Sequence, residues 1–227
     1  MNTFREIIYM ILDEIKVSTD DAYFTEDHII NLIKDYRVLV LKQRYSDIKK
    51  QIPESNYQTI CLDLIEVPAI SGEPCEGGSY LRSKEKVPFL MQIGAPKVYP
   101  IDYYQGEITY TSRERMRYVG YNKYLQNIIY CSIGPDNYLY FKSNNPQYLY
   151  LEKVKVTGVF EDSVSTSNLE CSDGKQCDLL DRVFPLEDSL IPIVRELVVK
   201  ELLGANYRPK DEENNAKDDL AGITVKE

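Results

Sequence analysis

Two cysteines near the C-terminal third of the chain are its best candidates for a metal site. Cys171 and Cys177 bracket a polar stretch, with five residues between them. Structural zinc sites combine closely spaced cysteine pairs with histidines or further pairs, and this sequence supplies neither near the two thiols. A zinc site and an ordinary loop with free thiols are the alternatives, and the spacing favours the loop. We predict no metal site and no cofactor.

The only histidine, His28, is the remaining candidate for acid–base chemistry. It falls in the first turn of a predicted helix, where the helix dipole disfavours a protonated imidazole. Its neighbours in sequence do not form the nucleophile–base pattern of a catalytic set. We interpret His28 as a surface residue and predict that the chain is not an enzyme.

A glycine-rich stretch and pairs of neighbouring acids complete the set of possible ligand-binding residues. Residues 72–78 lack the lysine followed by serine or threonine, and the helix, that a phosphate-binding loop needs. Adjacent carboxylates such as Glu161 and Asp162 are more often solvated than bound to a cation. The residue types therefore favour an assembly component over a reaction.

Composition narrows the class of protein further. A formal net charge of −9 over 227 residues disfavours nonspecific nucleic-acid binding, because an acidic surface repels phosphates. Five cysteines without paired spacing indicate reduced thiols in a protein made in a cytoplasm. The sequence contains neither a signal peptide pattern nor a run approaching the ~20 apolar residues that span a bilayer, so no membrane partner is expected.

Two helices are predicted at the start of the chain. The first follows an apolar stripe at helical spacing, formed by Phe4, Ile7, Ile8, Ile11, Leu12 and Ile15. The second begins after Thr25, a favourable N-cap, and ends before Pro53 at the latest. A polar connection between them predicts an antiparallel hairpin.

A period near two replaces the helical period between Tyr57 and Phe160, which predicts a sandwich or small barrel. Much of the chain's tyrosine lies here, which suits either a protein interface or a simple strand preference. Stacking on single-stranded nucleic acid is a weaker alternative, because Glu107 and Glu114 lie among the local bases. The candidate strands are 59–67, 88–93, 107–111, 115–119, 128–133, 138–142 and 149–160.

A last amphipathic helix and a charged tail end the chain. We expect Ser189 to cap this helix, Pro192 to lie in its first turn and Gly204 to end it. Residues 210–227 hold six acids against three lysines and no sustained apolar period. The predicted fold is thus α+β, divided into an N-terminal helical hairpin (1–53), an inserted tyrosine-rich antiparallel β domain (54–162), an acidic loop (163–184), a C-terminal helix packing on the hairpin (185–205) and an extended C-terminal arm (206–227).

This layout resembles the head-to-tail connector proteins of tailed bacteriophages. Three stretches, Tyr57–Ile70, Arg113–Tyr124 and Val198–Pro209, are similar to the ring, or adaptor, protein of crAss-like phages, and the similarity extends over nearly the whole chain. The resemblance implies a structural virion protein at the head–tail junction, assembled in the host bacterial cytoplasm.

The resemblance also implies partners. It implies a dodecameric ring below the portal protein, followed by a downstream tail ring or hub protein, with genomic DNA passing through the lumen without sequence-specific binding. The C-terminal arm would bind the portal through Asn206, Tyr207, Arg208, Pro209 and Leu220. A tail-tube or stopper protein, or a carbohydrate-binding tail module, is the alternative.

Opposite charges on separate segments suggest how neighbouring copies meet. Residues 34–50 hold six bases and two acids, whereas residues 161–181 hold six acids and one lysine. Such segments can complement each other across a ring interface, and solvated surface charge is the alternative. The candidate interface residues are Lys42, Arg44, Asp173 and Asp178.

Overall fold

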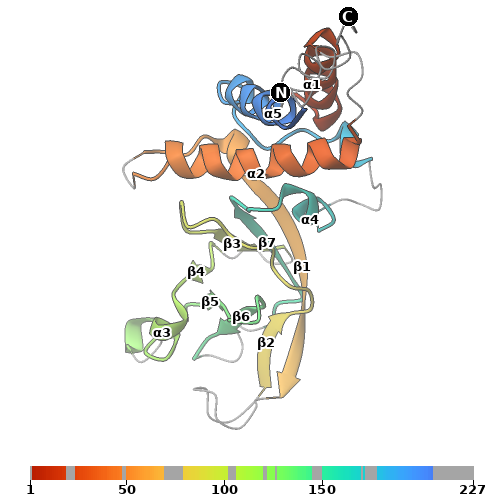
Figure 1. The fold of residues 1–227 in the computed structure, drawn as a ribbon. Helices are drawn as coiled ribbons and strands as arrows, with labels where there is room; N and C mark the ends of the chain where they lie inside the picture. The colour runs from red at the N-terminus through yellow and green to blue at the C-terminus, as the bar shows by residue number, and fades with distance from the viewer. Residues whose placement is uncertain are drawn as a thin grey trace, which may run out of the picture.

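A layer of helices lies on one end of a small β barrel (Figure 1). The structure is a computed structural model. It describes residues 2–18, 24–47, 50–68, 79–101, 106–119, 122–125, 127–144, 150–169, 171 and 178–206.

The first helix, α1 (Phe4–Ser18), forms where the apolar stripe predicts it. Its stripe is buried against the other helices, which satisfies the usual requirement of an amphipathic helix. The buried stripe residues, each at most 2% exposed, are Phe4, Ile7, Ile8, Ile11 and Ile15.

The second helix, α2 (Glu26–Arg44), begins directly after Thr25, as predicted. Thr25 has extended backbone, but its hydroxyl makes no capping hydrogen bond. Its carbonyl oxygen instead accepts the amides of His28 and Ile29. The N-cap prediction is therefore correct in position and wrong in chemistry.

The last helix, α5 (Ile191–Asn206), confirms the placement of Pro192 in a first turn. The two predicted ends are wrong. The hydroxyl of Ser189 donates to the Glu187 carboxylate at 2.8 Å instead of capping the helix. Gly204 lies inside the helix, which runs two residues further.

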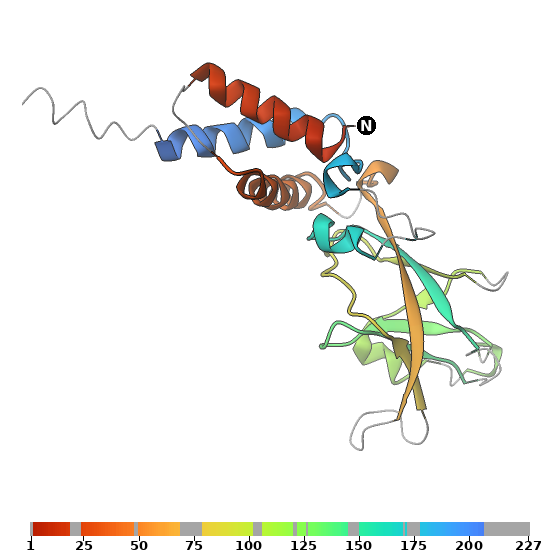
Figure 2. The ribbon, with the colours of Figure 1, turned by 90° about the vertical axis from the view of Figure 1, so that its right-hand side faces the viewer.

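The helices do not form the predicted hairpin. Figures 1 and 2 show α2 crossing α1 at an angle, with α5 packed against both. The core between them includes Ile11, Ile33 and Val198. Because α5 shares this core, the N-terminal helices and the last helix form one layer.

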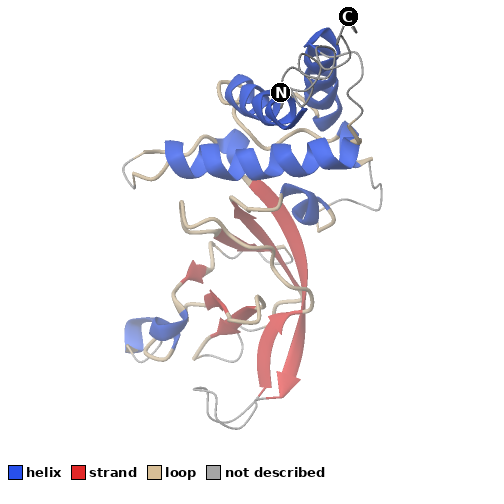
Figure 3. Ribbon diagram, viewed as in Figure 1, coloured by secondary structure: helices blue, strands red, loops and turns tan. Residues whose placement is uncertain are grey.

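Seven strands form a single sheet in the order β3-β7-β1-β2-β6-β5-β4 (Figure 3). The sheet nearly closes, because Ile108, just before the edge strand β4, forms a bridge with Val98 of the other edge strand, β3, in which the Ile108 amide donates to the Val98 carbonyl at 2.7 Å. The strands are β1 (Gln58–Pro68), β2 (Ser79–Ser83), β3 (Lys97–Pro100), β4 (Thr109–Tyr110), β5 (Tyr130–Ile133), β6 (Leu139–Lys142) and β7 (Lys153–Gly158).

The long strand β1 organises this sheet by pairing with two partners in succession. Its first half, from Gln58 to Asp63, is antiparallel to β7. Its second half, from Leu64 to Pro68, is antiparallel to β2. The sheet is mixed, because β4 and β5 are parallel. The prediction of an antiparallel domain is wrong for that pair.

Other strand predictions also fail locally. Residues 115–119 were predicted as a strand. Residues 115 and 116 instead end a short helix, α3 (Arg113–Met116), and residues 117–119 form a turn after it. Residues 88–93 contain only a bridge between Leu90 and Phe160. The strands β2 and β3 were not predicted.

The barrel has an apolar core of its own, separate from that of the helices. Alternate residues of β7, including Val154 and Val156, are buried, while Lys153 and Lys155 are exposed. This confirms the prediction of one wet face for that strand. The remaining core includes Ile60, Leu62, Val98, Cys131, Phe141 and Phe160.

The chain returns from the barrel to the helices through short helical turns. The predicted acidic loop begins instead with the helix α4 (Ser163–Ser167), and a 3₁₀ turn follows at η4 (Leu179–Asp181). A second 3₁₀ turn, η1 (Glu54–Asn56), connects α2 to β1, and a third, η2 (Lys123–Leu125), precedes β5. Among the described residues, no helix combines the length and apolar character needed to cross a membrane.

Candidate functional site

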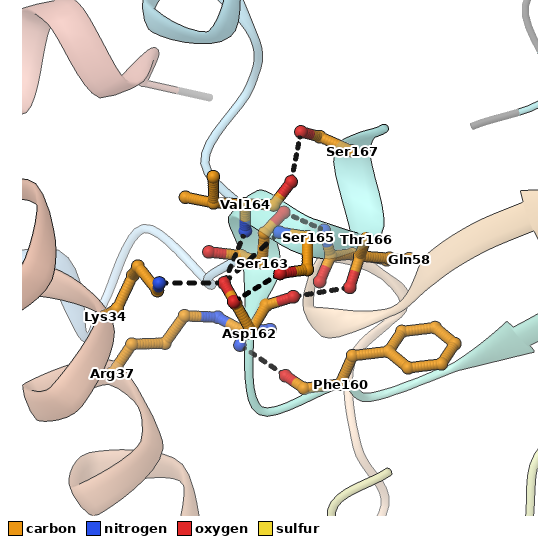
Figure 4. Close-up of polar contacts among 10 residues, drawn as sticks. All are labelled: Lys34, Arg37, Gln58, Phe160, Asp162, Ser163, Val164, Ser165, Thr166 and Ser167. Carbon is orange, nitrogen blue, oxygen red and sulfur yellow. Dashed lines mark hydrogen bonds and ion pairs between the residues drawn. The ribbon is translucent and has the colours of Figure 1, made fainter. Parts of the chain in front are cut away.

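A buried arginine joins the helical layer to the barrel. Arg37 of α2 is fully buried, and Figure 4 shows its side chain directed at the end of the barrel. Its Nε donates to the Pro185 carbonyl at 2.9 Å, and its Nη1 donates to the Phe160 carbonyl at 2.7 Å. One side chain thus holds two segments that lie more than a hundred residues further along the chain.

The charge of Arg37 survives burial. Burial lowers its pKa to about 10, and the nearby Asp162 carboxylate partly offsets that effect. The guanidinium is therefore still cationic at neutral pH. Removing Arg37 from this buried site is costly, because the two carbonyl groups lose their hydrogen bonds and Asp162 loses a nearby opposite charge.

Asp162 links the same helix to α4. It is the N-cap of α4, and its Oδ1 accepts the amides of Val164 at 3.0 Å and Ser165 at 3.2 Å. Lys34 of α2 places its Nζ 2.9 Å from the same oxygen (Figure 4). Burial by itself raises the pKa of Asp162, but hydrogen bonds from Ser165 and Lys34 outweigh it and lower the pKa.

The predicted interface residues are partly engaged within the chain. Lys42 forms an ion pair with Glu161 at 2.9 Å, and Asp178 forms one with Arg5 at 3.2 Å. Arg44 is exposed near the end of α2. Asp173 lies outside the described residues. The bases of α2 and the start of the acidic segment therefore complement each other inside one subunit.

A disulfide contradicts the prediction of reduced thiols. Cys61 of β1 and Cys171 are bonded, with their Cα atoms 5.0 Å apart. The bond ties the barrel to the segment that returns to the helical layer. Cys131 is a free thiol, and burial raises its pKa well above the usual range. Cys75 and Cys177 lie outside the described residues, so the predicted loop between Cys171 and Cys177 is not tested.

Other predicted ligand groups lie apart from one another. His28 is exposed, and its ring stacks on Phe24 with the ring centroids 6.4 Å apart. Within the described ranges, no group of three or more potential metal ligands comes together. A shallow hollow of about 410 Å³ between η1 and β7 is lined by residues such as Tyr57, Thr59 and Lys155. The Thr59 hydroxyl in this lining pairs with the Thr157 hydroxyl at 3.0 Å.

The tyrosines divide between core and surface. Tyr130 is buried in β5, as a strand preference predicts, whereas other rings are largely exposed. Tyr118, just after α3, is 77% exposed, and Tyr124 of η2 is 82% exposed. Tyr150 is 71% exposed beyond β6. Large exposed rings of this kind are typical of protein interfaces.

The predicted arm begins at the end of α5. Asn206 is the last residue of that helix, which lies away from the barrel in Figure 2. Tyr207, Arg208, Pro209 and Leu220 lie outside the described residues.

Comparison of the sequence with known proteins identifies its family. The sequence model described as "Phage tail ring protein 2" matches residues 6–220. The chain belongs to this family of phage tail ring proteins. It is also 67% identical over 220 residues to "Ring protein 2" of Bacteroides phage crAss001, covering 96% of this chain and 98% of that protein. The resemblance to crAss-like phage ring proteins is confirmed.

Membership in the phage tail ring protein family makes this chain a structural ring component of a virion tail. Such a ring is formed by copies of the chain together with tail-associated partners. The family is a structural one and not a family of enzymes. For a ring component, the functional residues are those that hold its two parts together and those that meet its neighbours. Arg37 and Asp162 belong to the first group, and sequence periodicity did not identify them.

Proposed function

We propose that this chain forms a ring that connects the portal to the tail and continues the DNA channel at the head–tail junction. The observation that carries the proposal is its similarity to a ring protein along nearly the whole chain. A ring of identical copies needs two different patches on each copy, and the chain offers exposed acids, Asp178 and Asp181, in the helical layer and exposed rings, Tyr118 and Tyr124, on the barrel.

The portal-binding role belongs to residues 206–227. The end of α5 supports this proposal, because it lies on the side of the helical layer away from the barrel (Figure 2). The segment after it has six acids and three lysines between residues 210 and 227, without an apolar period that would fold alone. Such a segment gains order on a partner surface.

The contact between copies uses the acidic segment that contains Asp173 and Asp178. On the basic side of this proposed interface, α2 supplies Lys42 and Arg44. Because Lys42 already contacts Glu161, reversal of Arg44 is the cleaner test of that basic side. Arg44→Glu should weaken ring formation in a salt-dependent way, and unchanged assembly would remove Arg44 from the interface.

Mass photometry tests the connector role directly. The full chain should form ring-sized particles, alone or when mixed with the portal protein of the same phage. A variant ending at Asn206 should keep the same far-ultraviolet circular dichroism and lose portal binding. A chain that stays monomeric with the portal, or that binds glycans as a monomer, would support a carbohydrate-binding tail module instead.

A further inference from the structure

A basic and aromatic surface lies at the end of the barrel opposite the helices. It consists of residues 113–119 and 122–125, here called the basic tip, and includes α3, which lies at the lower left of the molecule in Figure 1, away from the helical layer. Between residues 113 and 123, three arginines and one lysine stand against Glu114, which makes this stretch +3 in a chain of net charge −9. Its sign is therefore opposite to that of the chain as a whole.

The basic tip carries two largely exposed tyrosine rings. Tyr118 and Tyr124 are 77% and 82% exposed. The Nζ of Lys123 lies 5.3 Å from the centre of the Tyr124 ring. Exposed tyrosines next to arginines are the composition of interface hot spots. Single exposed rings are common on protein surfaces, but two largely exposed rings six residues apart in one basic stretch are not expected of a solvated face.

The basic tip is also anchored to the barrel. Met116 is buried at 8% exposure, and Lys142 of β6 donates its Nζ to the Met116 carbonyl at 3.1 Å. The amide of Tyr124 donates to the Asn122 side chain at 3.0 Å. A surface ordered in this way before binding loses less conformational entropy on association.

A complementary surface lies in the helical layer of the same chain. Residues 178–188 carry four acids and one arginine, which makes this acidic run −3. Asp178 and Asp181 both contact Arg5 of α1, yet their side chains remain 59% and 57% exposed. The acidic run and the basic tip are therefore equal and opposite in formal charge, and they lie at different ends of the molecule (Figure 1).

We propose that the basic tip of one copy docks on the acidic run of the next copy in the ring. This inference rests on the proposed ring function. It assigns the basic side of the interface to the tip, because Lys42 of α2 already pairs with Glu161 in the same chain. A head-to-tail ring requires two different patches on each subunit, which these two surfaces satisfy. DNA is the less suitable occupant, because Glu114 lies within the tip and the chain as a whole repels phosphates.

The decisive experiment follows ring formation of full-length variants by mass photometry across concentration and salt. Arg115→Glu/Arg117→Glu should raise the concentration for half-assembly by about tenfold or more, as expected for loss of hot-spot contacts. Tyr118→Ser/Tyr124→Ser should weaken assembly without changing charge. The matched control Lys84→Glu/Lys86→Glu, which makes the same charge change on an exposed turn after β2, should assemble like the unmodified chain.

A charge swap then tests the pairing itself. Adding Asp178→Lys to Arg115→Glu/Arg117→Glu should recover part of the lost assembly. Failure to recover, or normal assembly of both tip variants, would overturn the inference. Circular dichroism melts identify any variant that fails to fold, in which case the tyrosine variant decides.

Two further outcomes separate the alternatives. If the tip variants form normal rings but lose binding to a labelled DNA duplex, the basic tip contacts nucleic acid and the inference is wrong. If the unmodified chain forms no ring, alone or with the portal, the proposed function fails and the inference that rests on it fails too, whereas normal rings from both tip variants overturn the inference alone.

Discussion

Arg37 of α2 donates a 2.7 Å hydrogen bond to the carbonyl of Phe160 at the end of the barrel sheet. This contact, with the bond to Pro185, fixes the helical layer on the barrel through a buried charge. Arg37 thereby ties the position of the helical layer to that of the barrel.

Replacing Arg37 should strongly destabilise the chain. Arg37→Met leaves two buried carbonyl groups without a donor and should lower the free energy of unfolding by about 3 kcal/mol. Urea unfolding followed by circular dichroism measures the change. The control Arg44→Met, on the exposed end of the same helix, should change it by less than ~0.5 kcal/mol. If both substitutions lowered the free energy of unfolding equally, the buried contacts of Arg37 would contribute no more to stability than an exposed side chain does.

Acid should remove the contribution of Asp162. Its pKa in the folded chain lies below the ordinary value of 3.8, so its charge stabilises the fold above that pH and the effect is lost as pH falls through the folded pKa. Asp162→Asn keeps a favourable N-cap residue but removes the charge. The difference in Tm between the two proteins should be constant above about pH 5 and should shrink as the pH falls below about 4.

The pairing with Lys34 provides the control for that experiment. In a Lys34→Met background, the effect of Asp162→Asn on Tm at neutral pH should be smaller, because the ion partner is already absent. A difference that is independent of both pH and Lys34 would assign the role of Asp162 to capping alone.

Loss of the disulfide should lower stability under nonreducing conditions. The bond between Cys61 and Cys171 closes a loop with a sequence separation of 110, and disulfides of this kind contribute about 2–5 kcal/mol. Peptide mapping without reductant should recover the two cysteines in one linked peptide. Reductant should lower the Tm of the unmodified chain and leave Cys61→Ser/Cys171→Ser unchanged. Equal responses to reductant would contradict the bond.

The turn between β5 and β6 should tolerate glycine and reject a branched side chain. Asn137 has φ of 63°, in the left-handed region, and its carbonyl accepts the amide of buried Val87. Asn137→Val should cost about 1–3 kcal/mol, whereas Asn137→Gly should be close to neutral. Thermal unfolding of the two variants checks this order, and a Val variant as stable as the Gly variant would refute it.

Local patterns predicted most of the helices and several strands. The stripe from Phe4 to Ile15 and the start of α2 after Thr25 were identified because helical spacing and capping depend on neighbouring residues. The helix α3 was predicted as a strand, since four residues are too few to show a helical period. The strands β2 and β3 are also short, and their pairing partners lie far away in the sequence.

The candidate site was less accessible to sequence reasoning. The opposite charges of α2 and residues 161–181 were recognised, but their partners were assigned between copies. The structure pairs Lys42 with Glu161 and Lys34 with Asp162 in one chain. A charge pattern gives sign and position along the chain, whereas partners depend on which segments come within a few ångströms.

The sequence alone determined the three long helices, α1, α2 and α5, and the alternation of β7, because the periods of 3.6 and two residues reflect local backbone geometry. It also determined family membership, through similarity along nearly the whole chain. Only the tertiary structure decided that β4 runs parallel to β5, that Cys61 meets Cys171 and that Arg37 is buried beneath Phe160. Each of these depends on bringing together segments distant in sequence, where many pairings satisfy the same local pattern and packing selects one.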